Sequence, residues 1–168
     1  GRPIPSGRVS VKQALVFLVV QCLLGLAVLL QFNFHTVVLA TASLLIVAIY
    51  PFMKRITNWP QLVLGLAFNW GALVGWSAVW GSLDVAALTL YAGGIAWTLA
   101  YDTIYALQDR EDDALVGVRS TARLFAEKWR SWTSIFYIFA LALWELRRQR
   151  RNAARQLDEV RVLLRDLS

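Results

Sequence analysis

Long stretches without charge dominate this 168-residue sequence. The apolar runs lie at about 14–30, 36–53, 61–83 and 85–107, and only the last contains an acid, Asp102, near its end. A helix of ~20 apolar residues is long enough to cross a bilayer. Because 58% of all residues are hydrophobic, the composition also exceeds that of an ordinary soluble domain. The sequence therefore predicts an all-α, polytopic membrane helical bundle with four transmembrane helices.

The basic residues indicate how these helices are oriented. Before residue 145 every Lys and Arg precedes the first run, follows the second or follows the fourth, and the loops 31–36 and 80–84 contain none. Basic residues accumulate on the cytoplasmic side of short loops. The N-terminus, the 54–61 loop and the residues after the fourth run are thus predicted to face the cytoplasm or its equivalent.

Polar residues inside the runs need partners away from lipid. Asn69 lies in the third run among Gly65, Gly71 and Gly75, where small residues allow helices to pack closely. An interhelical hydrogen bond at Asn69 is at least as good an interpretation as a role in a pocket. His35 is interpreted as a solvated loop residue.

Five carboxylates gather after the fourth run, in the stretch "YDTIYALQDREDDALVGVRST". They are Asp102, Asp109, Glu111, Asp112 and Asp113. If the helix continues past Leu107, then Asp102, Asp109 and Asp113 share one stripe of its surface. An ionised acid inside the apolar run costs about 2.5 kcal/mol or more without a partner, which favours a cation site over a simple helix exit.

Carboxylates that leave coordination positions open suit Mg²⁺, which completes its shell with water and with substrate phosphate oxygens. Basic partners for a phosphorylated ligand are present on the same predicted side in Lys54, Arg55, Arg119 and Arg123. On chemistry alone a solvated charged loop remains an equal alternative. There is no Walker loop, no HExxH motif and no Ser, His and Asp set to indicate another reaction class.

Three segments resemble a known family. The acidic stretch resembles the second aspartate-rich motif of the UbiA superfamily of membrane prenyltransferases, whose DxxxD element corresponds to Asp109 and Asp113. "YPFMKRITNWPQLVLGLAFNWGALVGW" is similar to the 4-hydroxybenzoate polyprenyltransferase branch of ubiquinone biosynthesis, and "RPIPSG" at 2–7 looks like the sequence that follows the first aspartate-rich motif. The resemblance covers about residues 1–140.

The resemblance implies Mg²⁺-dependent transfer of a polyprenyl group from its diphosphate to the ring of 4-hydroxybenzoate. It implies metal binding by Asp109 and Asp113 with Asp112 in support, a catalytic role for these two acids and Asp102, and diphosphate binding by Lys54, Arg55 and Arg119. The aromatic residues Trp97, Tyr101 and Tyr105 are candidates to face the developing carbocation, with helix packing an equal alternative. The expected partners are polyprenyl diphosphate, 4-hydroxybenzoate and the lipid bilayer, with no nucleic acid. The expected location is the bacterial or mitochondrial inner membrane.

Both ends are expected to depart from the family. The first aspartate-rich motif should precede "RPIPSG", so we expect a partial, inactive UbiA-type domain at 1–144. Residues 131–144 form a short fifth apolar segment. The tail at 145–168 is predicted to be a basic amphipathic helix, with an apolar seam at Leu146, Ala153, Leu157, Val160, Leu164 and Leu167.

The tail's seven arginines conflict with the charge rule if 131–144 crosses the membrane. We therefore expect that this segment does not cross in the usual way, or that the tail is foreign to the family. The alternative function is a non-enzymatic membrane remnant or assembly module whose acidic loop binds cations or a partner.

Overall fold

The computed structural model describes residues 3–166, which form helices joined by short connections. The long helices are α1 (Val11–Leu29), α2 (Phe34–Ile56), α3 (Pro60–Trp80), α4 (Val85–Tyr105) and α7 (Trp129–Asp166). The short ones are α5 (Arg110–Leu115), α6 (Thr121–Phe125) and the 3-10 turn η1 (Ala126–Lys128). The predicted all-helical bundle is confirmed.

Local sequence explains where the long helices begin and end. Ser10 and Gln13 form a capping box at the start of α1, and Asn33 and Asp84 cap α2 and α4 by accepting hydrogen bonds from backbone amides. After α3 the chain turns at Gly81, whose φ of 68° is a left-handed conformation that glycine adopts without strain. These capping residues place the helix ends within a few residues of the limits of the apolar runs predicted from the sequence.

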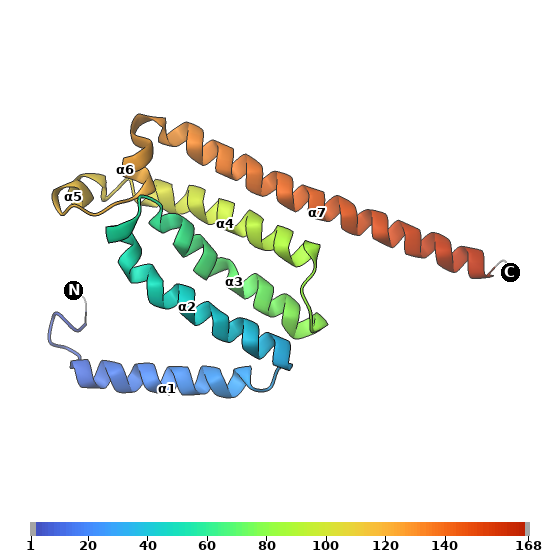
Figure 1. Ribbon diagram of the computed structural model, residues 1–168, viewed down its shortest axis with the longest axis horizontal. Helices are drawn as coiled ribbons and strands as arrows, with labels where there is room; N and C mark the ends of the chain where they lie inside the picture. Colours follow the sequence, from blue (N-terminus) through green and yellow to red (C-terminus); the bar gives the residue numbers. More distant parts are fainter. Residues whose placement is uncertain (1–2, 167–168) are drawn as a thin grey trace.

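The long helices α1, α2, α3, α4 and α7 lie side by side in chain order, with successive neighbours in contact (Figure 1). Among the described residues, α1, α2 and α3 are long and apolar enough to cross a membrane. The fourth predicted span corresponds to α4, a helix of 21 residues that does not belong to this group. Its crossing stays a prediction.

Helix α7 is the longest element, with 38 residues. Its first half packs along α4 and its second half extends beyond the other helices (Figure 1). The segment 131–144 is thus part of one continuous helix, and the predicted boundary at 144/145 falls inside it. The prediction that the tail is helical is confirmed up to Asp166. Of the predicted apolar seam, Leu146 and Leu157 are exposed, and the side chains from residue 160 onward lie outside the described set.

Close packing of α3 on α4 involves Gly65 and the side-chain amide of Asn69. A Cβ at Gly65 would lie 3.2 Å from Ile95, whereas one at Gly71 or Gly75 would meet nothing within 4 Å. The prediction that all three glycines allow close approach is therefore wrong for the latter two, because they face away from neighbouring helices. Asn69 forms the interhelical hydrogen bond expected from the sequence, donating to Thr98 Oγ1 at 2.8 Å.

Candidate functional site

The predicted basic and acidic residues meet at one end of the bundle, where α2 and α4 end and α3 and α7 begin (Figure 1). Backbone contacts hold this end together. The amide of Arg119 donates to the carbonyl of Lys54 at 2.9 Å, and its guanidinium donates to the carbonyl of Ile56 at 2.7 Å. The loop after the acidic stretch is therefore fixed against the end of α2.

The acids do not share the stripe expected from a continuous helix. Helix α4 ends at Tyr105, residues 106–109 form tight turns, and α5 begins at Arg110 after Asp109. The break has a physical reason: a new helix start places Glu111, Asp112 and Asp113 in a first turn, where the helix dipole stabilises negative charge. The prediction that Asp102, Asp109 and Asp113 share one stripe of a continuous helix is therefore wrong.

The acids differ in exposure. Asp102 and Asp113 are half-buried, whereas Asp109, Glu111 and Asp112 are exposed. Among the side chains that the structure describes, no three acidic, His or Cys residues come together as a ready metal cage. Mg²⁺ commonly takes only one or two protein carboxylates and completes its shell with water and phosphate oxygens, so the donors at this end fit that mode of binding.

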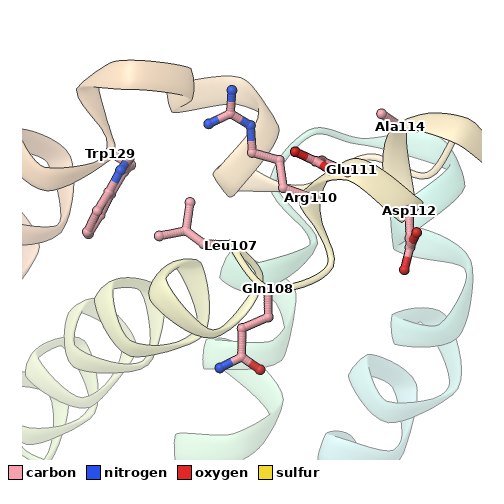
Figure 2. A pocket seen from close by; sticks show the side chains of 7 residues that line it. All are labelled: Leu107, Gln108, Arg110, Glu111, Asp112, Ala114 and Trp129. Atoms are coloured by element: carbon pink, nitrogen blue, oxygen red, sulfur yellow. The ribbon is translucent and has the colours of Figure 1, made fainter.

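A cavity of about 740 Å³ lies beside α5 (Figure 2). Its lining consists of Leu107, Gln108, Arg110, Glu111, Asp112, Ala114 and Trp129. Figure 2 shows Arg110 and Asp112 projecting to opposite sides of this segment. Arg110 pairs with Glu127 at 3.4 Å, which links α5 to the 3-10 turn η1 just before α7. The cavity lining thus combines two acids, one base and one aromatic side chain.

A second cavity, of about 390 Å³, lies between α3 and α4. Leu64, Phe68, Trp97 and Tyr101 give it an apolar surface, and Thr98 and Asp102 complete the lining. Lys54, near the end of α2, is close enough for its charge to act on Asp102. The apolar lining of this cavity therefore includes one half-buried carboxylate. Tyr105 stacks on Tyr101 at 6.2 Å but is not part of this lining.

A third cavity at the same end is basic. It has a volume of about 440 Å³ and is lined by Asn58, Gly117, Arg119, Arg123 and Leu124. Arg119 thus lies on a concave basic surface, and its binding of a diphosphate stays a prediction. Arg55 is exposed at the end of α2 and does not line this cavity.

Two residues hold this end in shape through contacts that the sequence did not indicate. The guanidinium of Arg123 donates to the carbonyls of Asp113 and Val118, which fixes the loop between α5 and α6. Gln61 is buried and accepts a hydrogen bond from the amide of Thr121 at 3.0 Å. Both partners are distant in sequence or are backbone atoms, so neither bond leaves a motif in the sequence.

Together these features define a helical membrane protein with charged cavities at one end of its bundle and an apolar groove between α3 and α4. The chain belongs to the UbiA prenyltransferase family, whose model it matches over residues 1–147. No solved structure matches the chain significantly.

The chain is similar to curated proteins named mitochondrial 4-hydroxybenzoate polyprenyltransferases. The rat protein is 57% identical over 136 residues, which is 80% of this chain and 36% of the relative. The human protein is 53% identical over 141 residues, which is 83% of this chain and 38% of the relative. The Arabidopsis thaliana protein is 54% identical over 136 residues, which is 80% of this chain and 33% of the relative. The chain thus spans little more than a third of the length of these relatives.

Proposed function

We propose that this chain carries part of the active site of a membrane prenyltransferase, which moves a polyprenyl group from its diphosphate to the ring of 4-hydroxybenzoate. The observation that carries the proposal is the convergence of the family's acidic motif, a basic cavity and an apolar groove at one end of a bundle that matches the UbiA family. The relatives' names supply the substrate pair and favour a mitochondrial membrane.

Each part of the site has a role in this reaction. The apolar groove between α3 and α4 suits an isoprenoid chain, with Trp97 and Tyr101 presenting ring faces that attract a developing cation by up to ~2 kcal/mol. Asp109, Asp112 and Asp113 are the proposed Mg²⁺ ligands, and this ion would neutralise the diphosphate when bound. Lys54, Arg55 and Arg119 are the proposed diphosphate ligands.

In the reaction, the allylic C–O bond breaks and the diphosphate leaves with the electron pair. The electron-rich ring carbon beside the hydroxyl of 4-hydroxybenzoate then bonds to the allylic carbon, and the ring loses a proton. Basic side chains stabilise the leaving group as its charge grows. Asp102, in the last turn of α4, is the proposed catalytic carboxylate at the charged end of the groove, where the charge of Lys54 acts on it.

The membrane domain is proposed to occupy 1–144 and the basic tail 145–168. The proposed orientation places the charged end on the matrix or cytoplasmic side, because basic residues of short loops stay on that side. The described Lys and Arg residues before the tail precede or begin α1, or lie at or beyond the ends of α2 and α4.

A chimera tests the transfer reaction. Residues 2–140 of this chain would replace the aligned segment of the rat relative, and transfer of radiolabelled 4-hydroxybenzoate into lipid would be measured with Mg²⁺ and a polyprenyl diphosphate. We expect activity in the chimera and a loss of about a hundredfold or more in Asp109→Asn and Asp113→Asn. Asp84→Asn is the matched control, since it removes an acid at the other end of the bundle and Asn caps a helix equally well.

A binding experiment uses the chain itself. A fluorescent, non-transferable prenyl diphosphate analogue should bind in the presence of Mg²⁺, and Arg119→Gln should weaken this binding. Full activity of the Asp109→Asn and Asp113→Asn chimeras would overturn the proposed role of these acids. Binding of the analogue that does not change with Mg²⁺ would overturn the proposed metal dependence.

A further inference from the structure

A separate charged cavity lies at the end of the bundle opposite the acidic loop. It has a volume of about 280 Å³ and lies where α3 ends, α4 begins and α7 leaves the bundle. Its lining is Trp76 from α3, Val85, Ala86 and Thr89 from α4, and Arg147, Arg150 and Arg151 from α7. One wall is thus apolar and the other carries three positive charges.

The three arginines lie on one face of α7, because their spacing of three and four residues matches the helical repeat. The guanidinium carbon of Arg147 lies 5.7 Å from the ring centre of Trp76. Its Nε is buried and has no hydrogen-bond partner among the described residues. A buried donor without a partner is costly, so an acceptor from outside the protein would relieve that cost.

Among the described residues, none of the three arginines forms a recorded ion pair with an acid. The ion pair recorded on α7 joins Arg148 to Glu145 at 3.5 Å, and neither residue lines the cavity. Three like charges on adjacent turns repel one another, so an anion placed among them would be stabilised. Arginine is well suited to phosphate, which it binds through two parallel hydrogen bonds.

The position of the cavity indicates an amphiphilic ligand. Trp76 stacks with Trp80 at 6.2 Å, at the end of a helix that is long and apolar enough to cross a membrane. Tryptophans at the ends of such helices mark the depth of the lipid headgroups. A ligand here would have its charge at headgroup depth and its apolar part against Trp76, Val85 and Ala86.

From this arrangement we propose that the cavity binds an anionic phospholipid, whose phosphate contacts Arg147, Arg150 and Arg151 and whose acyl chain lies along the apolar wall. A soluble phosphate would use the arginines but leave that wall unfilled. A zwitterionic phospholipid carries a cation that the arginines repel. The site is independent of the proposed prenyl transfer, which involves the other end of the bundle.

Native mass spectrometry of the full chain tests the proposal. The chain is released from mixed micelles of phosphatidylglycerol and phosphatidylcholine, which share the phosphate but differ in net charge. Arg147→Gln/Arg150→Gln removes two cavity charges, and the matched control Arg148→Gln/Arg155→Gln removes two charges of the same helix that do not line the cavity. Arg150→Gln alone covers the case that the double variant misfolds, because Arg150 is exposed.

We expect the double variant to retain about tenfold less phosphatidylglycerol, the single variant to lose part of that retention, and the control to stay within about twofold of the unmodified chain. Equal loss in the control would overturn the proposal, since general charge attraction would then explain binding. Equal retention of phosphatidylcholine by the unmodified chain would also overturn it. So would displacement of the lipid by millimolar glycerol phosphate, which would indicate a soluble anion as the ligand.

Discussion

Replacing Gly93 with alanine is expected to weaken the packing of α7 on α4. A Cβ at this position would lie 2.6 Å from Cδ1 of Trp144 and still closer to its Nε1. The indole cannot move aside freely, because it stacks on Trp97 with ring centres 5.6 Å apart. The added methyl group must therefore push α7 outward or force Trp144 from its conformation.

The size of the effect follows from this overlap. Overpacking by one methyl group in a close contact typically costs about 1–3 kcal/mol. For a chain of 168 residues this corresponds to a fall in apparent melting temperature of about 2–12 °C. Because Trp144 and Arg147 lie one turn apart on α7, the same displacement would move Arg147 away from Trp76.

The assay is thermal unfolding in detergent, followed by intrinsic tryptophan fluorescence. Gly71→Ala is the matched control, since a Cβ there meets nothing within 4 Å and alanine is the better helix former by about 0.5–1 kcal/mol. We expect Gly93→Ala to melt below the unmodified chain and Gly71→Ala at or above it. In a Trp144→Phe background the cost of Gly93→Ala should shrink, because the nearest overlapping atom, Nε1, is absent.

An equal or higher melting temperature for Gly93→Ala than for Gly71→Ala would refute this reasoning, because α7 would then not pack on α4 through this contact. A cost that stays the same in the Trp144→Phe background would likewise exclude Trp144 as its source.

Further predictions concern the polar contacts. Asn69→Ala should lower stability by about 0.6–2 kcal/mol through loss of the bond to Thr98, seen as a lower melting temperature, whereas Thr98→Ser keeps the acceptor and should melt nearly unchanged. Gln61→Leu leaves the buried amide of Thr121 without its acceptor and should cost about 1–3 kcal/mol, so an unchanged melting temperature would contradict the bond. Arg123→Gln should free the loop it holds and accelerate tryptic cleavage after Arg119 in limited proteolysis, and a cleavage rate equal to that of the unmodified chain would argue against this role.

The sequence by itself determined the helical bundle, because the apolar runs and their caps are local features. A capping residue at Ser10, Asn33 or Asp84 and a left-handed Gly81 act within a few residues of the helix ends they define. The family's acidic motif is also local, so Asp109 and Asp113 were recognisable without a structure. The pattern of basic residues also predicted that the basic loops lie at one end of the bundle.

Only the tertiary structure decided which of these residues meet. The break after Tyr105 separates Asp102 from the acids of α5. The helical periodicity predicted one shared stripe of acids, because it assumes that the helix continues. The packing of α7 on α4 and the cavity at Arg147 join residues about sixty positions apart. Such contacts depend on the shapes of facing helices, such as the space left by Gly93, which no spacing within one helix encodes.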